Sequence, residues 1–193
     1  QSKALAKMIS GHAEQLSTDM DGFAKLLPTI KSNEALGYGT HDAERYGDCV
    51  AIKTKLQAQS DQSNLARTKE YFKYANAPGM MMLDSDPSRE HSIDPVRLMS
   101  YLMTIWPQLK KVGYVTRGSV SAGVHKTGQK PSHSKGFHLY IGVNRADDIP
   151  RIGAVLFNRL WLLGLGYITI TSADTMLLRT PIDAVVFSPE RLD

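Results

Sequence analysis

Two aspartates follow an apolar run in residues 80–87 (MMMLDSDP). In an extended strand alternate side chains share a face, so we expect Asp84 and Asp86 to point the same way. Two adjacent carboxylates at the end of a buried strand are costly unless a cation neutralises them. Mg²⁺ binds one or two carboxylates together with substrate phosphates. The stretch therefore predicts a divalent-metal site, with an acidic turn closed by Pro87 as the alternative interpretation.

A metal site of this kind needs phosphate-binding groups, and residues 132–140 (SHSKGFHLY) contain suitable types. Ser134, Lys135 and the Gly136 amide are good phosphate ligands. His138 follows in an apolar strand, on the face opposite Phe137. The alternative is a polar hairpin loop followed by one structural histidine.

A third carboxylate occurs in residues 179–183 (RTPID). If this segment is extended, Arg179 and Asp183 share a face, and Asp183 completes a set of three acids. Arg117, Ser119 and Ser121 form a polar row on one face of another predicted strand, where they could line the same cleft. A surface ion pair and a solvent-facing strand are the simpler interpretations of these two groups.

The elements that would position these residues follow from hydrophobic periodicity. Helices begin at Asp94-Pro95 and at Asp148, the second ending at Gly164 and Gly166. Strands are predicted at 79–85, 114–124, 137–143, 167–171, 176–180 and 184–188. This order predicts an α+β fold with the β-α-β-β-α-β core of ferredoxin-like and RNA-recognition-motif (RRM)-like domains.

The preceding residues, 1–77, are predicted to form a separate, mostly helical subdomain, leaving 78–193 as the core domain. Apolar residues recur at helical spacing between Leu5 and Leu16, and residues 51–65 read as a polar helix or connector. Residues 67–74 (RTKEYFKY) could line a nucleic-acid path. They could equally form a helix with a basic face and an aromatic core stripe.

Composition excludes several classes of protein. The 193 residues carry a net charge of +4, which permits a polyanionic partner without requiring one. The single Cys49 excludes an internal disulfide and fits a reducing compartment. We expect a cytoplasmic protein with no membrane contact, because no apolar run reaches transmembrane length. The start at Gln1 suggests a fragment of a longer chain.

The order of these motifs resembles the archaeo-eukaryotic primase superfamily, and in particular the primase-polymerase domains of phages, plasmids and integrative elements. Residues 82–86 (MLDSD) resemble its first motif. Residues 134–140 (SKGFHLY) are similar to the second, and residues 178–183 (LRTPID) to the third. The resemblance covers residues 80–193.

The resemblance implies a DNA primase or DNA-directed polymerase that transfers nucleotides by a two-metal mechanism. Asp84, Asp86 and Asp183 would be catalytic and would hold two Mg²⁺ or Mn²⁺ ions. The nucleoside triphosphate would be bound by His138, Ser134 and Lys135, with Arg179, Arg117, Ser119 and Ser121 as further candidates. A single-stranded DNA template and a helicase in the same polypeptide or complex are the implied partners, in a bacterial or phage-encoded replication system.

Two other functions remain open. A replication initiator or relaxase of the His-hydrophobe-His class needs two histidines on one strand and a tyrosine on a later helix. Only His138 is present in residues 137–140, and residues 147–163 contain no tyrosine. An RRM-like nucleic-acid-binding module needs exposed aromatic residues on its central strands, for which Tyr114 and Tyr140 are the candidates. D-x-D glycosyltransferases and phosphatases fit less well, because the parallel nucleotide-binding half and a Gly-Thr after Asp86 are missing.

Overall fold

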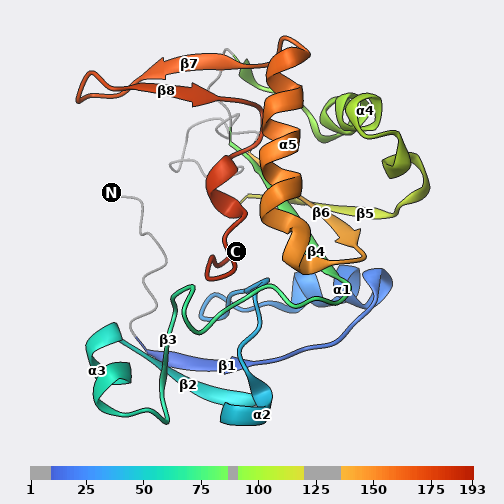
Figure 1. Cartoon of the computed structure of the whole chain (residues 1–193). Helices are drawn as coiled ribbons and strands as arrows, with labels where there is room; N and C mark the ends of the chain where they lie inside the picture. The colour runs from blue at the N-terminus through green and yellow to red at the C-terminus, as the bar shows by residue number, and fades with distance from the viewer. Residues whose placement is uncertain (1–9, 87–90, 120–135) are drawn as a thin grey trace, which may run out of the picture. The chain divides into compact units, whose positions relative to one another are not determined.

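The computed structural model describes residues 10–86, 91–119 and 136–193 (Figure 1). The chain divides into two compact units, one of residues 10–75 with 188–193 and one of residues 76–187. The boundary after residue 75 lies two residues before the predicted one. Residues 188–193, which the sequence analysis assigned to the C-terminal domain, belong with the first unit.

The second unit, Asn76–Phe187, is α+β. Its elements follow the predicted order, except at the C-terminal end. They are β4 (Gly79–Ser85), α4 (Pro95–Ile105), η3 (Pro107–Lys111), β5 (Tyr114–Gly118), β6 (Phe137–Val143), η4 (Ala146–Asp148), α5 (Ile149–Leu162), β7 (Tyr167–Ile170), β8 (Met176–Arg179) and η5 (Ala184–Val186). Strand β5 covers residues 114–118 of the strand predicted at 114–124, and residues 120–124 lie outside the described residues.

Three strands of this unit form one sheet in the order β4-β6-β5, with both neighbouring pairs antiparallel. The pairing of Leu83 with Leu139 fixes the register and, with it, the residues on each face. Met81, Leu83, Leu139 and Ile141 share one face and are fully buried. The other face carries Asp84 and His138, together with the buried residues Met82 and Tyr140, so the candidate site lies on the face opposite Leu83 and Leu139.

Both helices of this unit have an apolar stripe. In α4 the buried residues are Leu98, Met99 and Leu102, and the helix starts where the Asp94 carboxylate accepts a hydrogen bond from the Arg97 amide at 2.9 Å. Asp148 precedes α5 but makes no such capping bond. It is already in helical conformation at the end of η4, and its carboxylate pairs with Arg151.

The C-terminal end of the unit differs from the prediction. Strands β7 and β8 form a separate two-stranded sheet rather than joining β4, and residues 184–186 form the helical turn η5 rather than a strand. The turn forms because the Asp183 side chain accepts a hydrogen bond from the Val185 amide at 3.0 Å. Phe187 is buried against Gly153 of α5, where a Cβ atom would lie 2.2 Å from its ring.

The first unit is not mostly helical in its described residues, which corrects the sequence prediction. A three-stranded sheet in the order β1-β2-β3 is formed by β1 (Gly11–Glu14), β2 (Cys49–Lys53) and β3 (Leu65–Ala66). Short helices accompany it at α1 (Met20–Leu26), η1 (Leu27–Thr29), α2 (Ala43–Tyr46) and α3 (Lys55–Ser60). In β1 exposure alternates with period two, which suits a half-buried strand better than the predicted helix.

A small apolar core explains the basic and aromatic run of residues 67–74. Val50, Ile52 and Leu65 form this core, and Tyr71 and Phe72 pack against it. Tyr71 and Phe72 are therefore structural, although residues 67–74 form turns and irregular chain and not the predicted helix. Arg67 Nη1 donates a hydrogen bond to the carbonyl of Glu190 at 2.8 Å, which ties residues 188–193 to the same unit. Among the described residues of the whole chain, no helix is long and apolar enough to cross a membrane.

Candidate active site

One polar row crosses the β4-β6-β5 sheet. Asp84 of β4 lies opposite His138 of β6, and His138 lies opposite Arg117 of β5. The His138 Nε2 atom is 3.6 Å from Asp84 Oδ1, and the two side chains are 13% and 26% exposed. Because neighbouring strands are about 4.8 Å apart, the row spans roughly 10 Å from the strand that holds Asp84 to the strand that holds Arg117. The sequence analysis selected all three residues, and the register places them side by side.

A second row lies one step further along the same face. The Ser119 backbone amide donates a hydrogen bond to the Gly136 carbonyl at 2.9 Å. This bond extends the pairing of β5 and β6 by one residue on each strand. A Cβ atom on Gly136 would lie 2.7 Å from Ser119 Oγ and 3.1 Å from Asp86 Oδ1. The missing side chain therefore lets a carboxylate and a hydroxyl approach the Gly136 backbone closely, and the gap left between them is too small for a Cβ atom.

Asp183, the third predicted acid, is hydrogen-bonded to β4 through its backbone amide. The Asp183 amide donates a hydrogen bond to the Asp84 carbonyl at 2.8 Å, so residue 183 lies along β4 on the edge away from β6. The Asp183 Oδ1 atom accepts from the Val185 amide and is 3.9 Å from Arg179 Nη1. Arg179 and Asp183 are therefore neighbours as predicted, although a helical turn and not a strand follows Asp183.

Two aromatic residues near this site were not selected from the sequence. Tyr167 of β7 lies opposite Arg179 of β8. Its ring stacks on the His91 ring, with 3.8 Å between centroids and 8° between planes. Burial raises the pKa of the Tyr167 phenol; Arg179 acts in the opposite direction, and the Asp183 and Asp86 carboxylates raise it further. The register of the β7–β8 hairpin would have placed Tyr167 beside Arg179, but no sequence pattern indicated His91.

The site has the donor types that a hard divalent cation prefers, namely carboxylate oxygens that can be completed by substrate phosphates. Within residues 10–86, 91–119 and 136–193, no three His, Cys, Asp or Glu side chains are close enough together to hold a metal ion. Asp84 and Asp86 still fit a site of one or two carboxylates plus phosphates. Ser121, Ser134 and Lys135, the other predicted nucleotide-binding residues, lie outside the described residues.

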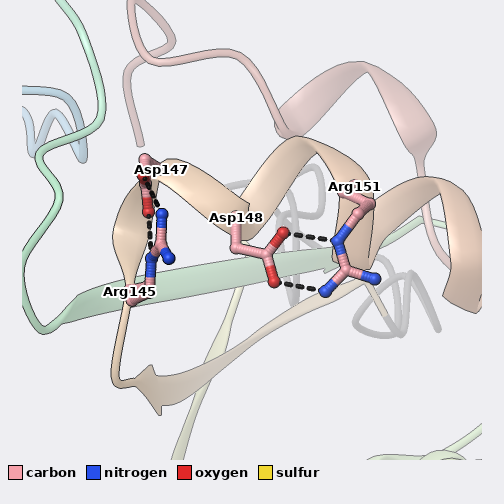
Figure 2. Close-up of polar contacts among 4 residues, drawn as sticks. All are labelled: Arg145, Asp147, Asp148 and Arg151. Carbon is pink, nitrogen blue, oxygen red and sulfur yellow. Dashed lines mark hydrogen bonds and ion pairs between the residues drawn. The ribbon is translucent and has the colours of Figure 1, made fainter.

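A second polar cluster lies beyond the other end of β6 (Figure 2). Arg145 forms a two-point pair with Asp147, at 3.1 and 2.7 Å, and Arg151 forms another with Asp148. Hydrogen bonds from the two arginines lower the pKa of both carboxyl groups. Each acid is thus already neutralised by its own arginine on the protein surface. The cluster lies at the connection from β6 to α5.

Comparisons with protein-family models, with curated proteins and with solved structures find no match for this chain. The case for a function therefore rests on the residues that the sheet brings together.

Proposed function

We propose that residues 76–187 catalyse metal-dependent nucleotidyl transfer, as the catalytic domain of a DNA primase-polymerase acting on single-stranded DNA. The observation that carries the proposal is the row of Asp84, His138 and Arg117 across three strands, with the Asp183 backbone bonded beside Asp84. Acidic groups lie at one end of this row and basic groups at the other. Such an order suits a substrate that carries a chain of phosphates and needs a cation at its reacting end.

The topology supports an RRM-like core in a modified form. The strand order β4-β6-β5 with antiparallel neighbours is the arrangement of the first three strands of a split β-α-β fold. A complete RRM-like sheet has a fourth strand beside β4. In this chain the Asp183 segment takes that place at Asp84, which delivers a third acid to the end of the strand where Asp84 and Asp86 lie.

Each residue has a role that its position suits. Asp84 and Asp86 would hold Mg²⁺ or Mn²⁺ together with substrate phosphates. The carboxylate of Asp183 is not grouped with them as a three-acid metal site in the described residues, so it would have to turn toward the cation to become a third ligand. Both described contacts of the Asp183 carboxylate use Oδ1, so Oδ2 is the oxygen that can turn toward a cation. When bound, the ions would lower the pKa of the attacking hydroxyl and neutralise charge on the departing pyrophosphate.

The phosphate-binding groups lie on the other two strands. His138 and Arg117 can donate to phosphate oxygens, and the Ser119 hydroxyl lies at the gap beside Gly136. The Tyr140 hydroxyl is 3.4 Å from His138 Nδ1, within hydrogen-bonding distance of the imidazole ring. Ser134, Lys135 and Ser121 are proposed to complete this group, with Arg179 balancing charge at Asp183.

Incorporation of nucleotides on primed and unprimed single-stranded DNA with Mg²⁺ or Mn²⁺ tests the proposal. We expect metal-dependent incorporation by the wild type and a loss of at least about 100-fold in an Asp84→Ala/Asp86→Ala variant, since two metal ligands disappear. Asp147→Ala is the matched control, because that aspartate pairs with Arg145 beyond the other end of β6. Absence of metal-dependent incorporation by the wild type would refute the proposal for this chain.

Tyr167 bears on the alternative function of a replication initiator or relaxase. Its phenol lies near the Asp86 and Asp183 carboxylates, but Tyr167 belongs to strand β7, whereas a replication initiator or relaxase of the His-hydrophobe-His class needs its tyrosine on a helix. That function predicts a covalent bond between DNA and Tyr167, which denaturing electrophoresis of the protein with labelled single-stranded DNA would reveal. The nucleotidyl-transfer proposal predicts no such product.

A further inference from the structure

Charge is distributed unevenly along the chain. Residues 95–146 contain eight Lys or Arg and no Asp or Glu. Because this segment contributes +8 to the net charge of +4, the remaining residues carry a net charge of −4. A basic segment in an otherwise acidic chain is typical of a protein that binds a polyanion through one part of its surface.

Three basic side chains of this segment are available to a partner. Within the residues that the structure describes, Lys110, Lys111 and Arg117 have no hydrogen bond or ion pair from their side chains. Arg97 and Arg145, by contrast, already bind a tyrosine and an aspartate close to them in the sequence. Arg117 belongs to the candidate site, which leaves the two lysines unexplained.

The local fold turns these two lysines toward solvent. Leu109 is 1% exposed and anchors the end of η3, whereas Lys110 and Lys111, which follow it, are exposed. Strand β5 begins three residues later at Tyr114, and η3 connects α4 to it (Figure 1). The lysines therefore lie at the start of a strand that forms one edge of the β4-β6-β5 sheet.

The same place carries an exposed aromatic ring. Tyr114 is 42% exposed, whereas Tyr140, the other aromatic candidate selected from the sequence, is fully buried. Surfaces that bind single-stranded nucleic acid combine positive charge along the backbone with aromatic rings on which bases stack. Lys110, Lys111 and Tyr114 supply both components within five residues.

We propose that Lys110, Lys111 and Tyr114 bind the single-stranded template, with the lysines on its phosphates and the tyrosine ring stacked on a base. This inference rests on the proposed nucleotidyl transfer, which requires a template. The partner is a single strand and not a duplex, because a base can stack on the ring only when its face is free of its neighbours.

This surface is continuous with the candidate site. Arg117 lies opposite His138, and Tyr114 is three residues from Arg117 on the same strand, which is about 10 Å. Side chains three residues apart on a strand point to opposite faces, so the template would pass around the open edge of β5. The unpaired part of the template would then be held on Tyr114 while its next base meets the incoming nucleotide.

Binding of DNA without nucleotide tests the inference. The probes are a fluorescent oligothymidylate and an abasic strand of the same length, which has the phosphates but no bases. Fluorescence anisotropy is measured over a range of salt concentrations with the full chain and with Lys110→Ala/Lys111→Ala, Tyr114→Ala and Tyr114→Phe variants.

Matched controls come from other exposed positions. Lys55→Ala/Lys69→Ala removes two exposed lysines of the first unit. Leu162→Ala removes an apolar side chain that is 88% exposed at the end of α5. Both controls should bind the two probes as the wild type does.

We expect Lys110→Ala/Lys111→Ala to weaken binding of both probes and to lower the slope of log K against log salt by about 1.4, since two phosphate contacts are lost. Tyr114→Ala should weaken oligothymidylate binding by about 5- to 150-fold, the range of one lost base–aromatic stack, with an unchanged slope. It should leave abasic binding unchanged. Tyr114→Phe should behave as the wild type, because it keeps the ring.

Three results would overturn the inference while leaving nucleotidyl transfer intact. They are an unchanged salt slope in the Lys110→Ala/Lys111→Ala variant, an equal loss in the Lys55→Ala/Lys69→Ala control, and an equal loss of both probes in Tyr114→Ala. A wild type that binds the strand but incorporates no nucleotide with Mg²⁺ or Mn²⁺ would instead refute the proposed function, and with it the role of the bound strand as a template.

Discussion

Replacing Gly136 with alanine would force a Cβ atom into a space between Asp86 and Ser119 that is too small for it. The new Cβ atom would lie 2.7 Å from Ser119 Oγ and 3.1 Å from Asp86 Oδ1, whereas ordinary contact begins at 3.4 Å. Ser119 Oγ must therefore move by about 0.7 Å and Asp86 Oδ1 by about 0.3 Å. Both atoms belong to side chains that can rotate, so the cost to folding should be only about 0.5–1.5 kcal/mol, that of a strained rotamer.

The effect on catalysis should be larger than the effect on stability. Catalytic groups need to be held within about 0.5 Å of their productive positions, and a displacement of 1 Å can cost about 100-fold in rate. We therefore expect Gly136→Ala to lower metal-dependent nucleotide incorporation by about 10- to 100-fold. The unfolding free energy, measured by urea denaturation, should fall by no more than about 1.5 kcal/mol.

A matched substitution separates the local effect from a general one. At Gly37 a Cβ atom would meet its nearest neighbours at 3.8 and 3.9 Å, which is ordinary contact, so Gly37→Ala should leave incorporation unchanged. If Gly136→Ala folds and incorporates nucleotides at the wild-type rate, the gap beside Asp86 has no part in catalysis and the placement of the nucleotide along this row is wrong.

Three further predictions concern stability and are measured by urea unfolding. Gly153→Ala should destabilise the protein by about 1–3 kcal/mol, because overlap with the buried Phe187 ring exceeds the gain of about 1 kcal/mol in helix propensity; a more stable variant would contradict this packing. Asp94→Ala should cost about 1 kcal/mol by removing the α4 cap, and Asp148→Ala should cost less because that side chain caps nothing; equal losses would show that the Asp94 bond is unimportant. Burial raises the pKa of Tyr74 to about 12, above its usual value of 10.0, so its contribution to stability is complete below pH 10 and is lost as the pH rises toward 12. Tyr74→Phe should flatten this dependence, and an unchanged slope between pH 10 and 12 would exclude Tyr74 as its source.

The sequence predicted the elements whose signals are local. The strand that ends at Asp84 and the strand that holds His138 are apolar runs of the right length, and Asp94-Pro95 is a strong helix start. Alternation along these strands was also enough to place Asp84, His138 and Arg117 on comparable faces before their pairing was known.

The errors have two physical causes, which are contacts between residues distant in sequence and, after Asp183, one local capping bond. The strand at Gly11–Glu14 is paired with Cys49–Lys53, and nothing near His12 in the sequence indicates that partner. The segment after Asp183 is apolar enough for a strand, but a single capping bond to Val185 starts a helical turn. The stacking of His91 on Tyr167 could not be predicted, because it joins residues that are far apart in the sequence.

Direct measurement of metal binding is the sharpest test of the site. Mn²⁺ binding can be followed by electron paramagnetic resonance with a non-hydrolysable nucleoside triphosphate present, in the wild type and in Asp84→Asn and Asp183→Asn variants. We expect nucleotide-dependent binding of two Mn²⁺ ions to the wild type and loss of at least one in each variant, because both aspartates hold metal in the proposed site. If both variants bind Mn²⁺ and nucleotide as the wild type does, these carboxylates are not metal ligands and the proposed mechanism is wrong.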